Sequence, residues 1–485
     1  MQLYDKDLLS VQEVRELVEK AKAAQEELSQ KSQAEVDAIV KSIAYAGVRN
    51  AKRLAKLAHE ETGFGIEADK VIKNIFGSRD VYEHIKDMKT IGELGYDEEK
   101  KVRTIAVPVG VIAGLIPSTN PTSTAFYKSE ISIKAGNAIV FSPHPNARNC
   151  ILEAVKVIRQ AIAEAGGNEN LVSCITIPTI QATDNLMKHP DVALILATGG
   201  SAMVRAAYSS GTPAIGVGPG NGPAYIEKTA DLPLAVKRIM DSKTFDNGTI
   251  CASEQSVVCD KDMEDAVRAE MEKQGAYFLT DEQIAKLGKF ILRANGTMNP
   301  MIVGKSAQVI ADLAGIDIPA GTKVLVAKET GIGRGHPYSN EKLAPILAFY
   351  TADDYKEICR LVQDILHYEG AGHTFSMHTK DPEMVNYFAM RVPASRIIVN
   401  TPSALGGIGG TTGLMPALTL GCGAIGGSAT SENVGPMNLL NKRHVAEGLL
   451  ELDEIKAGLP TCTDGMCSGP KAEDVDIDEH NQLPS

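Results

Sequence analysis

A cysteine follows a turn near the middle of the chain, in the stretch FDNGTICASEQSV from Phe245 to Val257. The Asn-Gly pair before Cys251 indicates a turn, and the polar residues after it indicate the edge of a domain. A free thiol has a pKa of about 8.5, so only about 3% is thiolate at neutral pH without help from the fold. A thiol at such an edge is a candidate nucleophile. For the remaining cysteines in apolar segments we expect small buried side chains: Cys150, Cys174, Cys259 and Cys359.

Length and composition narrow the class of protein. The 485 residues can form two or three domains, and the net charge of -12 without a basic stripe argues against nucleic-acid binding. The longest apolar run, residues 104–117, is too short and too broken by proline and glycine to span a membrane. The acidic, polar start of the chain predicts no export signal. Eight scattered cysteines without CxxC spacing predict reduced thiols, no metal site and a cytoplasmic protein.

Two series of alternating strands and helices must position the cysteine. Residues 11–90 predict helices, with a capping box of Ser10 and Glu13 at their start. Short apolar strands then alternate with helices from residue 137 to residue 220. A second series of the same kind follows the cysteine, from residue 262 to residue 366. Two such series predict an α/β protein with two doubly wound domains and a cleft between them.

Seven stretches, in order, carry a family resemblance: IPSTNPTSTAFYKS, FSPHPNAR, LILATGGSAMVRAAYSSGTPAIGVGPGNGPAYI, FDNGTICASEQSV, NEKLAPILAFY, SRIIVNTPS and LGCGAIGGSATSENVGPMNLLNK. Together they resemble the CoA-acylating aldehyde dehydrogenases, above all the aldehyde-dehydrogenase half of bifunctional aldehyde–alcohol dehydrogenases. The resemblance covers about residues 12 to 450.

This resemblance implies a reaction. Cys251 would attack an aldehyde, NAD would accept the hydride, and the thiol of coenzyme A would take the acyl group from the enzyme thioester. Asn120 and the Cys251 backbone N–H would stabilise the oxyanion. His373 would act on the CoA thiol or orient it. The alternatives are an Asx-Pro turn residue at Asn120 and a structural histidine at residue 373.

One expected group is missing. Relatives that hydrolyse the thioester carry a glutamate base, and Val217 stands where that base would be; residues 214–225 contain no carboxylate. An apolar side chain cannot activate water, whereas a thiol is acidic enough to need less help. The sequence therefore favours transfer to CoA over hydrolysis.

The coenzyme candidates follow from the resemblance and from one strand–turn–helix. Thr198, Gly199, Gly200 and Ser201 open a helix after a strand, where a pyrophosphate could bind. Glu341 would bind the nicotinamide ribose. Ser142 replaces a lysine found in many aldehyde dehydrogenases, which leaves NAD or NADP open, and we favour NAD. The remaining candidates are Pro117, Ser118, Thr119, His144, Gly216, Val217 and Gly218.

The implied architecture is that of an aldehyde dehydrogenase. We expect a Rossmann-like NAD-binding domain at residues 1–93 and 109–222, and an α/β catalytic domain at 223–436. A β-arm for oligomerisation would occupy 94–108 and 437–450, and a flexible tail 451–485. The arm predicts a homodimer or a higher oligomer.

Other readings stay open. A thiolase-type acyltransferase would form the same thioester without NAD. A scaffold role would use Leu449–Leu459, which has some amphipathic helical character and could dock on a microcompartment shell. We place acetaldehyde and acetyl-CoA first as substrates, before propionaldehyde, succinate semialdehyde and sulfoacetaldehyde. Arg334 and His336 are the basic candidates for an acidic acyl group. A separate alcohol dehydrogenase would then reduce the aldehyde further.

Overall fold

The structure is a computed structural model that describes residues 5–293, 296–457, 461–463 and 466–468. The chain divides into two compact units. The larger is Met1–Ile91 with Val107–Asn441, and the smaller is Gly92–Ala106 with Lys442–Ser485. Each is described by itself.

The larger unit contains a five-stranded parallel sheet with the order β5-β4-β3-β6-β7. The chain builds from β3 outward through β4 to β5 and then returns to the other side of β3. The strand order therefore reverses between β3 and β6, and ligands of open α/β sheets bind beyond the strand ends at such a point. The strands are β3 (Val111–Ile116), β4 (Ala138–Pro143), β5 (Val172–Cys174), β6 (Val192–Thr198) and β7 (Ala214–Val217).

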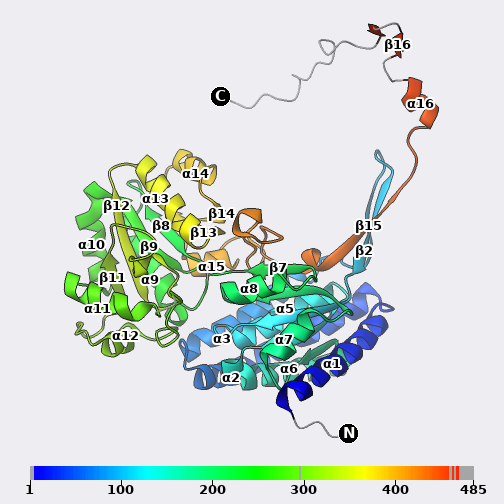
Figure 1. Ribbon diagram of the computed structural model, residues 1–485, viewed down its shortest axis with the longest axis horizontal. Coiled ribbons are helices and arrows are strands. Elements are labelled where there is room, and N and C mark those ends of the chain that lie inside the picture. Colours follow the sequence, from blue (N-terminus) through cyan, green and yellow to red (C-terminus); the bar gives the residue numbers. More distant parts are fainter. Residues whose placement is uncertain (1–4, 294–295, 458–460, 464–465, 469–485) are drawn as a thin grey trace. The chain divides into compact units, whose positions relative to one another are not determined.

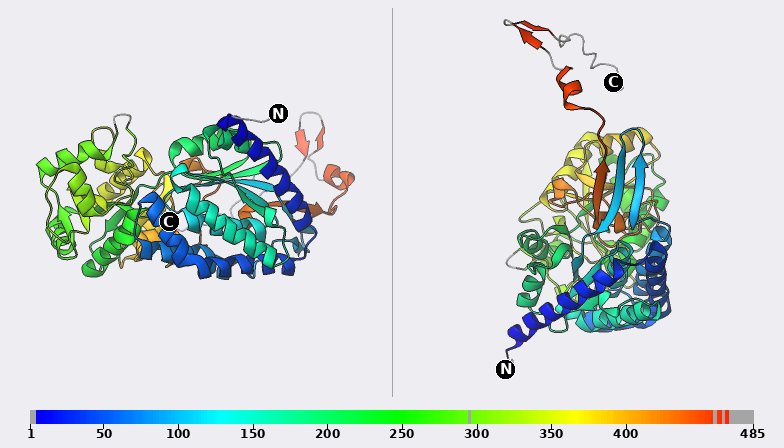
Figure 2. Two further views of the ribbon diagram at one scale, coloured as in Figure 1. Left: turned by 90° about the horizontal axis from the view of Figure 1, so that it is seen from below. Right: turned by 90° about the vertical axis from the view of Figure 1, so that its right-hand side faces the viewer.

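Helices cover both faces of this sheet. Helices α1 and α7 contact its strands on one face, α5 and α6 cover the other face, and α2 packs outside α5 and α6 (Figure 2). Apolar residues at helical spacing on α1, among them Val14, Val18 and Ala21, are buried, which confirms the predicted helix. The helices are α1 (Lys6–Leu28), α2 (Gln33–Thr62), α3 (Glu67–Ile75), α4 (Val81–Ile85), α5 (Pro121–Lys134), α6 (Arg148–Glu164), α7 (Ile180–Met187) and α8 (Ser201–Tyr208).

The predicted capping box of Ser10 and Glu13 is wrong. Helix α1 begins one turn earlier, because the Asp5 carboxylate accepts from the backbone N–H groups of Asp7 and Leu8. Glu13 instead accepts from the Thr176 backbone N–H at 2.9 Å. A long-range contact thus replaces the local one.

A seven-stranded parallel sheet, with the order β10-β11-β12-β9-β8-β13-β14, forms the rest of the larger unit (Figure 1). Both predicted α/β series are confirmed as parallel sheets, although both belong to one compact unit. The strands are β8 (Gly222–Ile226), β9 (Glu254–Asp260), β10 (Ala276–Phe278), β11 (Val324–Lys328), β12 (Ile346–Ala352), β13 (Gly372–His378) and β14 (Ala394–Val399). The helices are α9 (Leu232–Thr244), α10 (Glu264–Lys273), α11 (Asp281–Ile291), α12 (Ala307–Ala314), α13 (Tyr355–Tyr368), α14 (Pro382–Ala389) and α15 (Ser403–Gly407).

The smaller unit holds most of a three-stranded sheet of β1 (Gly92–Asp97), β2 (Val102–Pro108) and β15 (Leu440–Ala446), in the order β1-β2-β15. Strand β15 is exposed along nearly its whole length. Helix α16 (Leu452–Ala457) and the strand pair β16 (Thr461–Thr463) and β17 (Met466–Ser468) fall in the segment that we expected to be a flexible tail. Helix α16 lies within residues 449–459, for which the sequence indicated helical character. The other residues of that predicted tail, 458–460, 464–465 and 469–485, lie outside the described residues.

Candidate active site

A cavity of about 1070 Å³ lies where loops from both sheets of the larger unit meet. One wall is formed by the residues that follow β3, β4, β6 and β7. The other is formed by the segments before β9 and β12 and by the segment between α11 and α12. The cavity therefore lies at the strand-order reversal, where the topology predicts a ligand.

Most of the predicted site residues line this cavity: Cys251, Asn120, Pro117, Ser118, Thr119, Ser142, His144, Thr198, Gly199, Gly200, Val217, Gly218 and Glu341. Ser201, Gly216 and His373 do not line it, and neither do Arg334 and His336. The His336 ring instead pairs with the Glu329 carboxylate at 2.8 Å. Arg293, which the sequence did not reveal as a candidate, also lines the cavity.

A sharp turn places Cys251 at the cavity. After α9, Asp246, Asn247 and Gly248 have φ angles of 48°, 53° and 75°, three successive residues in the left-handed region. Asn and Asp tolerate this region better than other side chains. At Gly248 a β-carbon would also lie 3.0 Å from the Ala344 carbonyl oxygen. The Asn-Gly turn predicted before the cysteine is confirmed, with Asp246 as an additional member.

The Cys251 thiol is neutral in this state. Burial, and then the charge of the Glu341 carboxylate, raise the pKa of the thiol to about 12 against the opposing effect of the Arg396 guanidinium. A nucleophilic role for Cys251 therefore requires a group that removes the thiol proton.

Asn120 lies at the start of α5 but does not cap it. The helix has Pro121 at its first turn, and the Asn120 side chain makes no hydrogen bond to the helix N–H groups. Its Nδ2 instead lies 3.4 Å from the carbonyl oxygen of Thr249 and its Oδ1 lies 2.6 Å from Lys73 Nζ. This geometry directs the amide toward the cysteine segment and gives no support to the turn-residue alternative.

His373 lies behind the cysteine segment. A β-carbon on Gly220 would lie 2.0 Å from the Cys251 carbonyl oxygen and 3.1 Å from His373 Cε1. Gly220 therefore lies between the Cys251 backbone and the His373 ring. The His373 Nδ1 is 2.9 Å from Thr374 Oγ1, whereas the buried Nε2 has no hydrogen-bond partner among the described residues. Burial and the Arg396 guanidinium hold the pKa of His373 well below 6.5. The imidazole is therefore neutral.

Glu341 is a buried carboxyl group at the cavity. The Gly220 N–H donates to its Oε1 at 2.9 Å, and its own N–H donates to the Glu369 carboxylate at 2.6 Å. Burial, and then the charge of Glu369, raise the pKa of Glu341 to about 8. This group can thus exchange a proton near neutral pH.

The turn between β6 and α8 fits a pyrophosphate. Gly200 is the residue before α8, and a β-carbon added there would meet nothing within 4 Å. Open backbone at a helix N-terminus is what a close phosphate requires. At the end of β7, Val217 is 2% exposed and presents an apolar side chain to the cavity.

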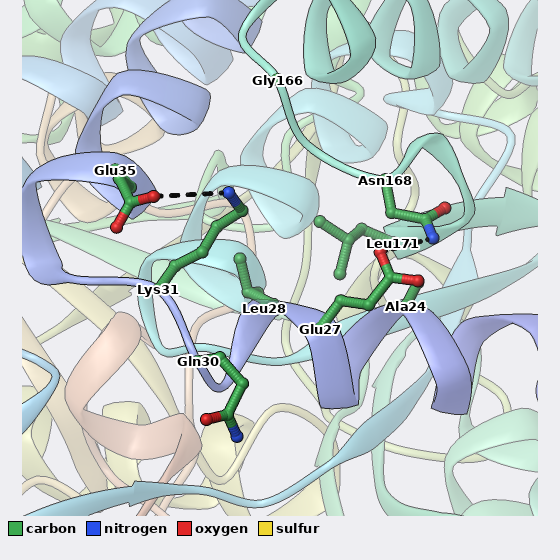
Figure 3. A pocket seen from close by; sticks show the side chains of 9 residues that line it. All are labelled: Ala24, Glu27, Leu28, Gln30, Lys31, Glu35, Gly166, Asn168 and Leu171. Carbon is green, nitrogen blue, oxygen red and sulfur yellow. Dashed lines mark hydrogen bonds and ion pairs between the residues drawn. The ribbon is translucent and has the colours of Figure 1, made fainter.

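A second cavity, of about 330 Å³, lies away from these residues, between α1, the start of α2 and the loop after α6 (Figure 3). Its polar groups bind one another: Asn168 donates to Glu27 at 2.9 Å, and Lys31 pairs with Glu35 at 3.5 Å.

In the described part of the chain, no three His, Cys, Asp or Glu residues are grouped to hold a metal. None of the helices that the structure describes is long and apolar enough to cross a bilayer.

The chain is similar to known proteins over most of its length. The model of the aldehyde dehydrogenase family matches residues 3–411. The bifunctional aldehyde-alcohol dehydrogenase AdhE of Escherichia coli K12 is 46% identical over 443 residues, which are 90% of this chain and 50% of that protein. A crystal structure of a probable aldehyde dehydrogenase from Listeria monocytogenes EGD-e has a TM-score of 0.92 at 64% identity, covering 93% of this chain and 100% of that one. An acetylating aldehyde dehydrogenase from Geobacillus thermoglucosidasius has a TM-score of 0.91 at 51% identity, covering 93% and 99%.

The chain belongs to the aldehyde dehydrogenase family, and the predicted α/β fold and family resemblance are confirmed. The chain spans about half the length of the first curated relatives that it matches.

Proposed function

We propose that the chain is a CoA-acylating aldehyde dehydrogenase, which converts an aldehyde, CoA and NAD reversibly into an acyl-CoA and NADH. The observation that carries this proposal is one cavity that holds a cysteine, an amide donor beside it and a valine in place of a hydrolytic base. The similarity to an acetylating enzyme supports the same conclusion.

The residues divide the chemistry among themselves. Cys251 forms the bond to the aldehyde carbon, and Glu341 accepts the thiol proton. Asn120 Nδ2 and the Cys251 N–H stabilise the oxyanion, a type of contact worth about 3–4 kcal/mol per donor. NAD, when bound, accepts the hydride. The acyl group then passes from the Cys251 sulfur to the CoA sulfur, the bond to Cys251 breaks, and the proton of the CoA thiol restores the Cys251 thiol. His373 would act on the CoA thiol or orient it.

Acetaldehyde and acetyl-CoA are the proposed substrates. The lining on the side of the seven-stranded sheet is mainly apolar: Ile250, Met298, Pro300, Val303 and Leu343. A small apolar acyl group suits these side chains. Arg293 also lines the cavity, so succinate semialdehyde and sulfoacetaldehyde stay as alternatives, as does propionaldehyde.

The direct test is NADH oxidation at 340 nm with acetyl-, propionyl-, butyryl- and succinyl-CoA, and with NADPH in parallel. We expect a clear rate with acetyl-CoA and no rate in Cys251→Ala. A thiolase-type reaction would proceed without any reduced nucleotide. Activity that survives in Cys251→Ala would remove the proposed nucleophile.

We further propose a homo-oligomer formed through the smaller unit. The exposed strand β15 at the edge of the three-stranded sheet offers unpaired backbone groups to a second copy. Leu449 to residue 459, which contains α16 with exposed Leu452 and Ile455, is the proposed contact with a microcompartment shell. Partition of the intact chain and of a chain truncated at residue 450 with shell proteins tests this contact; identical partition contradicts it.

A further inference from the structure

Two lysines on one face of α3 are buried against a single carboxylate. Lys70 and Lys73 are 3% and 2% exposed, and their ammonium groups lie 3.0 Å and 2.5 Å from Asp246 Oδ2. Buried charges are retained at a cost unless they are paired and hydrogen-bonded. The arrangement therefore needs an explanation beyond the stability of one ion pair.

The Lys73 ammonium uses all three of its N–H donors. It donates to Asp246 Oδ2, to Thr249 Oγ1 at 2.8 Å and to Asn120 Oδ1 at 2.6 Å. Two of these acceptors belong to the turn that carries Cys251, and the third is the proposed oxyanion donor. Lys70 also reaches Asp246, but its other contact is the Thr119 carbonyl oxygen at 3.4 Å. Of the two lysines, only Lys73 contacts the Asn120 side chain.

This contact determines which way the Asn120 amide faces. An ammonium group is only a donor, so the atom that it meets must be the amide oxygen. The Nδ2 group is then directed away from Lys73, and it lies 3.2 Å from Thr119 Oγ1 and 3.4 Å from the Thr249 carbonyl oxygen in the segment that ends at Cys251. The positive charge of Lys73 beside the amide oxygen also polarises the amide and strengthens the hydrogen bonds that Nδ2 donates.

We propose that Lys73 is a positioning residue for the reaction at Cys251: it orients and polarises the Asn120 amide so that its N–H faces the oxyanion. The proposal rests on the proposed function. Asp246 holds the ammonium group in place, and its own position is fixed by the backbone N–H of Ile66 at 2.6 Å.

The test compares three variants of the full chain in steady-state NADH oxidation with acetyl-CoA. Lys73→Met should lower kcat about 10- to 100-fold, which is a smaller loss than that caused by deleting an oxyanion donor. The KM for acetyl-CoA should stay within about threefold of the wild-type value. Lys70→Met is the matched control, because it removes the other buried lysine paired with Asp246, which does not contact the Asn120 side chain, and it should lower kcat less than threefold. Lys73→Gln matches methionine in length but keeps a donor, so it should recover part of the loss.

A double mutant separates positioning from general damage. If Lys73 acts through Asn120, Asn120→Ala with Lys73→Met should be no slower than Asn120→Ala alone. Multiplied losses would overturn the proposal, and so would equal losses in Lys73→Met and Lys70→Met. If Lys73→Met does not fold, equal kcat values for Lys73→Gln and wild type would overturn it. A wild-type chain without acyl-CoA-dependent NADH oxidation would instead refute the proposed function.

Discussion

The α-carbon of Gly220 faces the carbonyl oxygen of Cys251 so closely that a β-carbon there would lie 2.0 Å from it. The same glycine donates its N–H to Glu341 at 2.9 Å. Gly220 thus holds the cysteine segment and the acidic group of the cavity in one arrangement.

Gly220→Ala should therefore lose activity. Because the obstacle is a backbone oxygen, the Cys251 segment must move, and a displacement of about 1 Å at a reacting group can lower a rate about 100-fold. The measurement is kcat for NADH oxidation with acetyl-CoA, together with the melting temperature. Gly413→Ala is the control, since a β-carbon there meets nothing within 4 Å. Equal activity in both variants would show that the segment tolerates the shift.

Val217→Glu should introduce hydrolysis. Val217 ends β7 at the cavity wall, so a glutamate there would place a carboxylate where water can reach the thioester. We expect acid formation from acetaldehyde and NAD in the absence of CoA, measured by chromatography of acetate. Val303→Glu is the control, because it places a carboxylate on the opposite wall of the same cavity and not at the end of β7. If neither variant forms acetate, the missing base does not explain transfer to CoA.

The sequence predicted the alternating elements and the cysteine turn because both depend on local patterns. Apolar strands such as β3 and β4 are buried throughout, and the turn before Cys251 contains the Asn-Gly pair. Lys73 could not be found in this way. A lysine on a helix is ordinarily exposed, and its contact with Asp246 joins residues 173 positions apart.

The same limit applies to the basic residues. Arg334 and His336 were the basic candidates for an acidic acyl group because they lie together in a glycine-rich loop, yet neither residue lines the cavity. Arg293 does, and its neighbours in the sequence gave no signal for this. Whether a loop meets a cavity depends on how the strands are ordered, which the sequence pattern does not specify.

Asp246→Ala should destabilise the protein strongly. Removing the carboxylate takes away the ion pairs of the buried Lys70 and Lys73 and leaves only the half-buried Asp69 carboxylate near them. Breaking a buried pair in this way costs about 3–5 kcal/mol. The measurement is the midpoint of urea unfolding. Asp241→Ala is the matched control, since its ion pair with Lys237 is about half exposed and contributes about 0–1 kcal/mol.

The same ion pair predicts a dependence on acid. Burial opposes ionisation of Asp246, but Lys73 and Lys70 prevail and hold its pKa below 3.8. A carboxyl group with a lowered pKa in the folded state stabilises it above the unfolded pKa of about 3.9, and this stability is lost as the pH falls further. The wild-type midpoint should therefore fall more steeply below about pH 4 than that of Asp246→Ala. Parallel curves would contradict the ion pair.

Glu341 predicts the pH dependence of thioester formation. With a pKa of about 8, the carboxyl group is largely protonated at pH 7 and ionised above pH 8. If the ionised form accepts the Cys251 proton, the single-turnover rate of enzyme acylation by acetyl-CoA should rise through about pH 8. Glu341→Gln should be slower and should lack this rise.

Glu369→Gln removes the charge that raises the pKa of Glu341, so the rise should move to lower pH. Quenched samples analysed by mass spectrometry give the acylated fraction directly. An unchanged inflection in Glu341→Gln would assign the proton to another acceptor, and the neutral His373 would then be the group to replace.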